Sequence, residues 1–168
     1  IQAPHFVMYV KDLLVKKYGL PFVEKKGLKV ITSLDVKLQE MAQKIVTEEV
    51  NNNAYLNLTN GASLITDPGS GDILAMVGSK DFYDPNIGNV NVTISLRQPG
   101  SSIKVVTYSA AISKGFTPAT ILDDSPITYT FPSSPSYSPV NYDNRFYGKL
   151  PLRLALANSL NIPAVKTL

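Results

Sequence analysis

The sequence contains no cysteine. This absence excludes disulfide bonds, a thiolate zinc site, an iron–sulfur cluster and a cysteine nucleophile, and it is compatible with either redox compartment. The sequence also lacks a run of about 18 consecutive apolar residues, the length that spans a bilayer, and the basic, apolar and small-residue order of a signal peptide. We therefore expect any membrane anchor of the protein to lie outside this chain.

Neither sign of charge is in large excess or concentrated in one region. The 16 basic and 13 acidic residues give a net charge of +3, and they are scattered along the chain with no run longer than Glu24-Lys25-Lys26. Nucleic-acid-binding domains concentrate their basic residues in a patch or stripe. We expect no nucleic-acid partner.

Histidine occurs once, and the carboxylates form no recognisable site. His5 is far in sequence from any candidate nucleophile, which speaks against a Ser-His-Asp triad, and we interpret it as structural. The aspartates lie mostly in turn sequences, where Asp closes loops, and no pair of carboxylates has the context of a glycosidase acid and base. We predict no metal site and no cofactor.

The composition that remains is that of a folded protein. Of the 168 residues, 44% are hydrophobic and 17% are charged, whereas a disordered chain is poorer in large apolar residues. The length suits one domain with a hydrophobic core, or one domain with a small appended element.

The first third of the chain predicts two helices with a strand between them. Apolar residues at helical spacing over residues 4–18 end at Gly19. A second such run, from residue 36 to about 50, follows Asp35, which can cap a helix. Between the two, residues 27–34 are rich in β-branched residues and predict a short strand.

A β-hairpin is predicted next. Residues 62–66 and 72–77 have strand composition and flank the turn-forming sequence Asp67-Pro68-Gly69-Ser70-Gly71.

The second half predicts helices on either side of a long loop. Helical spacing extends over residues 101–115 and 150–158, while residues 116–148, which are rich in Pro, Ser, Tyr and Asn, predict a loop whose aromatic residues are buried. The alternative is that four of these aromatic residues line a substrate groove, namely Tyr137, Tyr142, Phe146 and Tyr147.

One short pattern can carry chemistry. Ser101-Ser102-Ile103-Lys104 places a hydroxyl at a predicted helix start, after the turn-forming Pro99-Gly100, and an amine one turn later on the same helix face. A lysine whose ammonium is disfavoured by burial can take the proton of a serine, and the helix start adds a positive potential and a free N–H for an oxyanion. Taken alone, the pattern favours the simpler interpretation of a serine cap followed by a solvated lysine.

The flanking residues favour the chemical interpretation. The segment Arg97-Gln98-Pro99-Gly100-Ser101-Ser102-Ile103-Lys104 resembles the nucleophile segment of the class A, bifunctional penicillin-binding proteins, which carry Ser-x-x-Lys. Residues 156–166 are similar to the segment around the family's Ser-x-Asn motif, here Ser159-Leu160-Asn161, although those three residues alone also fit a polar cap. Residues 67–78 and 3–7 resemble the opening of the transpeptidase domain and the linker before it.

The resemblance implies a fold and an activity. The fold is α/β (α+β), of the penicillin-binding protein/β-lactamase-like type, and the activity is that of a D,D-transpeptidase in cell-wall synthesis. Ser101 would attack the carbonyl between two D-alanines of a peptidoglycan stem peptide, with Lys104 as the base. Ser159 would relay a proton, and Asn161 would hold the substrate and the lysine. β-Lactam antibiotics would acylate the same serine, and the parent enzyme would be anchored to the membrane and act on its outer face.

The family's third motif, Lys-Thr-Gly or Lys-Ser-Gly, has no counterpart. Lys166-Thr167-Leu168 lacks the glycine and follows the Ser-x-Asn motif too closely, so we assign it no role. The resemblance therefore implies a partial fold that lacks the C-terminal strands and helix, with a linker region over residues 1–60 and the N-terminal portion of the transpeptidase domain over residues 61–168. We expect little or no turnover from this chain alone, and the remainder could be supplied by a second chain, removed or disordered.

Two other functions stay open. A serine β-lactamase or a β-lactam sensor shares Ser-x-x-Lys, although the class A flanks and the linker disfavour it. A non-catalytic scaffold or interaction fragment is supported by the absent third motif.

Overall fold

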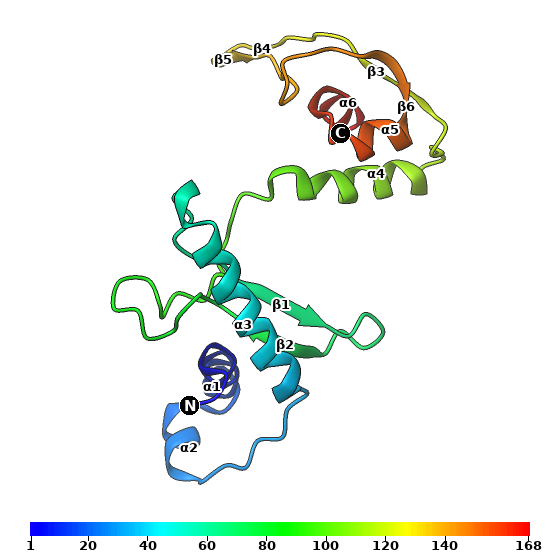
Figure 1. Cartoon of the computed structure of the whole chain (residues 1–168). Coiled ribbons are helices and arrows are strands. Elements are labelled where there is room, and N and C mark those ends of the chain that lie inside the picture. The colour runs from blue at the N-terminus through cyan, green and yellow to red at the C-terminus, as the bar shows by residue number, and fades with distance from the viewer. The chain divides into compact units, whose positions relative to one another are not determined.

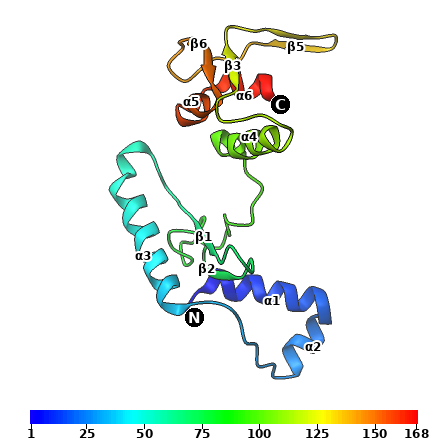
Figure 2. The same cartoon turned by 90° about the vertical axis from the view of Figure 1, so that its right-hand side faces the viewer.

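The computed structural model describes all 168 residues, which form two compact units, Ile1–Arg97 and Gln98–Leu168 (Figures 1 and 2). The first unit contains α1 (Pro4–Tyr18), α2 (Leu20–Lys25), α3 (Val36–Asn52), the 3₁₀ turn η1 (Ala54–Leu56), β1 (Ser63–Thr66) and β2 (Ile73–Val77). The second unit contains the 3₁₀ turn η2 (Gly100–Ser102), α4 (Ile103–Ser113), β3 (Ile121–Asp124), β4 (Tyr129–Phe131), β5 (Ser134–Tyr137), β6 (Gly148–Pro151), α5 (Leu152–Ala157) and α6 (Asn161–Thr167). The predicted mixture of helices and strands is confirmed. No helix is both long and apolar enough to cross a membrane.

The first unit is a β-hairpin with a helix on each face. β1 and β2 pair antiparallel, which confirms the predicted hairpin. Successive side chains of a strand point to opposite faces. Ala75 and Val77 pack with Ala42 of α3, while Met76 packs with Phe6 of α1.

Both long helices of this unit begin where the sequence predicts. Pro4 lies in the first turn of α1, where the N–H that it lacks would have had no helical partner, and Gly19, with φ 82°, ends the helix. Asp35 caps α3, because its carboxylate accepts a hydrogen bond from the Leu38 N–H at 3.0 Å.

The strand predicted over residues 27–34 is wrong. Residues 27–34 make no backbone hydrogen bond to β2. Only the end of the segment contacts the strand, where Ser33 Oγ donates to Ile73 O at 2.8 Å, and the first backbone bond follows it, from the Asp35 N–H to Leu74 O at 2.9 Å. The next position on this edge is occupied by the Gln39 side chain, which accepts from the Met76 N–H at 2.7 Å and donates to Met76 O at 3.2 Å. A side-chain amide thus satisfies the backbone groups that a third strand would have paired. The sequence pattern also missed α2.

The second unit packs three helices with the β3–β6 pair (Figures 1 and 2). Alternation along β3 turns Leu122 and Asp124 inward and leaves Ile121 and Asp123 outside. The core of the unit contains one tyrosine, two leucines and two alanines from four elements: Tyr108, Leu122, Leu152, Ala155 and Ala164.

The loop predicted over residues 116–148 is only partly correct, because it contains β3, β4 and β5. β4 and β5 form a short hairpin that extends away from the helices of its unit (Figure 2), and the rings of Tyr129 and Tyr137 stack on it at 6.4 Å. Such an arm has little but itself to pack against. The predicted burial of aromatic residues is wrong for five residues of the segment, which are at least 46% exposed: Phe131, Tyr137, Tyr142, Phe146 and Tyr147.

Candidate active site

Ser101 lies in η2, the turn that leads into α4. Gly100 has φ 54°, a left-handed conformation that glycine adopts without strain, and this provides the turn that the Pro-Gly sequence predicts. Ser102, not Ser101, bonds back onto the turn, since its hydroxyl and its N–H both donate to Pro99 O. Ser101 is exposed, and its N–H donates to no acceptor of the protein. The Ser101 N–H is therefore left without a protein acceptor at the start of a helix.

Lys104 brings the four predicted site residues together. It lies in the first turn of α4 and is 5% exposed. Its Nζ is 3.2 Å from Ser101 Oγ, 3.0 Å from Ser159 Oγ and 2.7 Å from Asn161 Oδ1, and it also donates to Ser159 O. One amine thus contacts three side chains from two segments that are far apart in the sequence.

Lys104 has no negative partner. The two ion pairs of the structure are Lys44–Glu48 and Lys166–Asp123, and neither involves it. Burial disfavours the ammonium form and lowers the pKa of Lys104 from its ordinary value of 10.5. An amine that is more readily deprotonated and lies within hydrogen-bond distance of a hydroxyl is suited to take its proton.

Ser159 is placed by the way in which α5 ends. Its N–H bonds to Leu156 O at 3.0 Å, and the Leu160 N–H bonds to Ala155 O at 2.9 Å, which is the hydrogen-bond pattern of a Schellman motif. The residue at the position of Ser159 in this motif is usually glycine because its φ is positive, and Ser159 has φ 50°. A side chain is thus retained at a strained position, and its hydroxyl meets Lys104.

Asn161 begins α6 and is held by three hydrogen bonds. Its side-chain Nδ2 donates to Val140 O at 2.8 Å, so its Oδ1 is turned towards Lys104. Its backbone N–H donates to Asn141 Oδ1, also at 2.8 Å.

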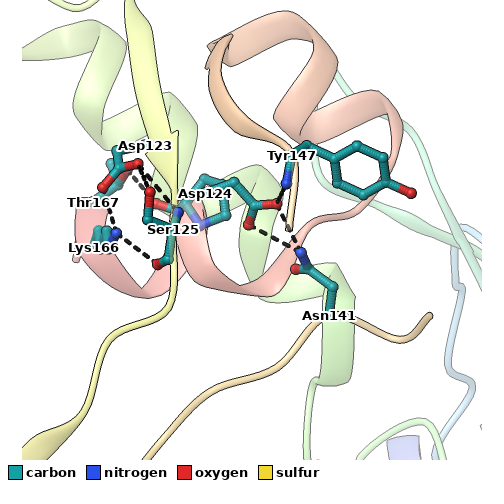
Figure 3. A network of polar contacts seen from close by, with 8 residues as sticks. Asp123, Asp124, Ser125, Asn141, Tyr147, Lys166 and Thr167 are labelled. Atoms are coloured by element: carbon teal, nitrogen blue, oxygen red, sulfur yellow. Dashed lines mark hydrogen bonds and ion pairs between the residues drawn. The ribbon is translucent and has the colours of Figure 1, made fainter. Parts of the chain in front are cut away.

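Two buried residues of this arrangement were missed by the sequence interpretation. Asn141 is 2% exposed and Asp124 is fully buried, and Figure 3 shows the Asn141 amide pointing at the Asp124 carboxylate. No sequence signal identifies them, because Asn141 lies among turn-forming residues and Asp124 is one of two adjacent aspartates. Lys166, to which no role was assigned, forms an ion pair of 2.7 Å with Asp123.

A pocket of about 280 Å³ lies beside Ser101. It is lined by Ser101, Lys104 and Asn161 together with apolar groups that include Ile103 and Val165. A larger pocket of about 610 Å³ lies in the first unit, but it contains no serine. The structure contains no group of three or more His, Cys, Asp or Glu residues that could hold a metal ion.

Comparison with known proteins identifies relatives along the whole chain. The family model described as "Penicillin binding protein transpeptidase domain" matches residues 61–168. Penicillin-binding protein 2D of Bacillus subtilis is 38% identical over 99% of this chain and 24% of its own length. Penicillin-binding protein 1B of Vibrio cholerae is 35% identical over 98% of this chain and 21% of its own length. The chain thus spans about a quarter of the length of these curated relatives.

Solved structures share the fold. Penicillin-binding protein 1A of Haemophilus influenzae superposes with a TM-score of 0.78 and 21% identity, over 98% of this chain and 38% of its own. PonA1 of Mycobacterium tuberculosis in complex with penicillin V superposes with a TM-score of 0.74 and 22% identity, over 99% of this chain and 42% of its own. Penicillin-binding protein A of the same organism, as a penicillin G acyl-enzyme complex, superposes with a TM-score of 0.64 and 24% identity, over 81% of this chain and 35% of its own.

These findings confirm the predicted fold class, since the chain matches a part of larger structures of penicillin-binding proteins. They also confirm the resemblance to the class A proteins, whose matches extend over the residues before residue 61. The chain belongs to the penicillin-binding protein transpeptidase family.

Proposed function

We propose that Ser101 is the nucleophile of a peptidoglycan D,D-transpeptidase and that Lys104 is its general base. The observation that carries this proposal is the 3.2 Å contact between the buried Lys104 Nζ and the exposed Ser101 Oγ, at a lysine whose pKa is lowered. A serine is a weak nucleophile until a neighbouring base removes its proton. Membership of the family supports the same assignment.

Acylation follows from this geometry. Lys104 takes the proton of Ser101 Oγ while Oγ bonds to the carbonyl carbon between the two D-alanines of a stem peptide. The free N–H of Ser101 donates to the oxyanion that forms. The C–N bond to the last D-alanine then breaks, and the proton passes from Lys104 through the Ser159 hydroxyl, 3.0 Å away, to the leaving amine.

Transfer completes the reaction. The amine of a neighbouring stem peptide attacks the ester carbonyl, the bond from Ser101 Oγ to carbon breaks, and the proton released by the amine returns to Oγ. Asn161 Oδ1 accepts from Lys104 Nζ at 2.7 Å, which holds the lysine in place, and the Asn161 amide also forms a hydrogen bond with the substrate. A β-lactam enters the first step as a substrate mimic and leaves Ser101 acylated.

The proposal extends to the organisation of the protein. Residues 1–60 form a linker region before the transpeptidase domain, of which residues 61–168 form the N-terminal portion. The whole protein is held at the outer face of the cytoplasmic membrane of a bacterium, where peptidoglycan is assembled.

The experiment is intact-mass spectrometry of the full natural protein that carries this chain, incubated with a penicillin. We expect one adduct per protein, absent in Ser101→Ala and retained in the matched control Ser102→Ala, whose hydroxyl is bonded to Pro99 O. An adduct that is hydrolysed within seconds would instead indicate a β-lactamase. A folded protein that forms no adduct and hydrolyses no penicillin would overturn the proposal in favour of a non-catalytic scaffold.

A further inference from the structure

A chain of buried hydrogen bonds connects strand β3 to the candidate active site. Asp124 accepts two hydrogen bonds from Asn141 Nδ2, at 3.0 and 2.8 Å, and one from the Tyr147 N–H at 2.9 Å (Figure 3). Asn141 Nδ2 also donates to Arg145 O at 2.8 Å. With its NH₂ group committed in this way, the amide of Asn141 has one orientation, in which Oδ1 faces the Asn161 N–H.

Asn161 forms two hydrogen bonds with the same loop. Asn141 Oδ1 accepts from its backbone N–H, and the neighbouring Val140 O accepts from its side-chain Nδ2, both at 2.8 Å. The first contact fixes where α6 begins, and the second fixes which end of the Asn161 amide meets Lys104. Asn161 Oδ1 then accepts from Lys104 Nζ at 2.7 Å.

We propose that Asn141, held by Asp124, is a positioning residue of the Ser101 site: it sets the place and orientation of Asn161 and, through Asn161, the place of the Lys104 amine. The inference rests on the proposed function of Ser101, which it deepens.

The burial and satisfaction of these groups support the proposal. Asp124 is a fully buried carboxylate without a basic partner, and such a group is retained in a core only when hydrogen bonds satisfy it. Its acceptors are used by Asn141 and Tyr147 and not by the hydroxyl of Tyr108, which is the one buried side-chain polar atom without a partner. The carboxylate is therefore directed at the loop that holds Asn161 and not at the nearby core.

The ion pair between the adjacent Asp123 and Lys166 provides a matched control. Asp123 points to the other side of β3 and pairs with Lys166, in the last turn of the same helix that Asn161 begins. Asp123 thus ties β3 directly to the last turn of α6, whereas Asp124 is linked through Asn141 to the start of α6, the end that reaches Lys104.

The test measures Ser101 acylation by a fluorescent penicillin in the full natural protein, separating the acylation rate constant from the initial affinity, at a temperature well below the melting temperature of every variant. For Asn141→Ala we expect the rate constant to fall by about 10- to 100-fold, because small misplacements of catalytic groups have effects of this size. The fraction of protein finally labelled stays complete. For Lys166→Met we expect a change of less than about twofold. A purely structural role would lower the melting temperature or the labelled fraction without this change in rate constant.

A swapped pair tests the direction of the contact. Asn141→Asp places two carboxylates together and is expected to slow acylation at least as much as Asn141→Ala. Adding Asp124→Asn restores a donor–acceptor pair between the two side chains and recovers part of the rate, while Arg145 O stays without its donor. If Asn141→Ala does not fold, Asp124→Asn alone decides by the same criterion. A folded variant of either residue that acylates within twofold of the parent overturns the proposal.

Hydrogen–deuterium exchange gives a reading that does not depend on acylation. The peptide that contains the Asn161 amide should exchange at least about 10-fold faster in Asn141→Ala, while the α5 peptide is unchanged, because the Asn141 contact protects that amide in the parent. A parent without a Ser101 adduct would count against the proposed function, and unchanged exchange at Asn161 would separately count against the positioning role.

Discussion

The two units of the chain use buried polar side chains in different ways. In the first unit they form two small separate groups: Gln39 satisfies both backbone groups of Met76, and His5 Nε2 lies 2.7 Å from Ser79 Oγ, which in turn donates to Gly88 O. In the second unit, Asp124, Asn141 and Lys104 belong to one connected series of hydrogen bonds, which ends at the exposed hydroxyl of Ser101.

The difference separates polar groups that support the fold from those that we propose support a reaction. A small separate group of this kind leaves nothing for a ligand to meet, and removing it destabilises the unit that contains it. A series of hydrogen bonds that begins in the packed core and ends at the surface fixes the position of an atom that a ligand can reach. Buried polar residues of the first unit should therefore affect stability, and those of the second unit should affect acylation.

The largest expected effect is that of Lys104→Met. Removal of the proposed base should slow penicillin acylation of Ser101 by about 10²- to 10⁴-fold. The melting temperature should change little, because removing a buried amine that has no negative partner offsets the loss of its hydrogen bonds to Ser159 and Asn161. Labelling kinetics and thermal unfolding check both statements, with the exposed Lys114→Met at the far end of α4 as the control. A Lys104→Met protein labelled within tenfold of the parent rate would rule out the base role.

Ser159→Gly should separate stability from activity at one position. Glycine relieves the left-handed backbone at φ 50°, so the free energy of unfolding should rise by up to about 1 kcal/mol. Loss of the hydroxyl that contacts Lys104 should slow acylation by about 10- to 100-fold, the equivalent of a hydrogen bond to a charged group. Asn57→Gly, at φ 59° in the first unit, is the control that should gain stability and keep its rate. A Ser159→Gly protein that keeps the parent rate would contradict the relay.

Gln39→Leu should show the opposite behaviour. The substitution leaves the Met76 N–H and C=O without partners, so we expect a loss of about 1–3 kcal/mol in the free energy of unfolding. Denaturant titration measures this loss. The acylation rate of Ser101, measured where the variant is folded, should not change, and a reduced rate there would show that the two units do not divide their roles as described.

The smallest expected effect is at the hairpin turn. Asp67 Oδ1 accepts from the N–H groups of Gly69 and Ser70, and these hydrogen bonds lower the pKa of its carboxyl from 3.8. Because the pKa is lower in the folded state, the stabilisation is present above about pH 4 and is lost as the pH falls through the folded pKa. The melting temperature of the parent should therefore fall slightly more on acidification than that of Asp67→Asn, as calorimetry at several pH values would show. Equal falls would mean that the charge contributes nothing to the turn.

Local sequence signals predicted the elements that depend on neighbouring residues. Asp35 caps α3, Gly19 ends α1, and the Asp67–Gly71 turn joins two strands, since in each case the deciding contacts lie within a few residues. The Ser101 and Lys104 contact was predicted for the same reason, because a helical turn places residues i and i+3 side by side.

The secondary-structure predictions were wrong where contacts with residues distant in the sequence decide the local structure. Residues 27–34 have strand composition, yet Gln39 takes the edge of β2 that they would have used. The segment 116–148 has loop composition, yet β3 pairs with β6 from the far side of that loop. The catalytic roles of four residues remain predictions: Ser101, Lys104, Ser159 and Asn161. The structure adds that the side chains of the other three all contact the amine of Lys104.

The sequence by itself determined the two long helices α1 and α3, the helix that follows Ser101, the β1–β2 hairpin and the family, because periodicity, caps, turns and motif flanks are properties of adjacent residues. Only the tertiary structure decided that Asp124 and Asn141 lie behind the site and that Ser159 adopts a strained conformation against Lys104. The physical reason is that burial and hydrogen-bond partners depend on which segments pack together, and the residues concerned are separated by turns whose composition says nothing about their final neighbours.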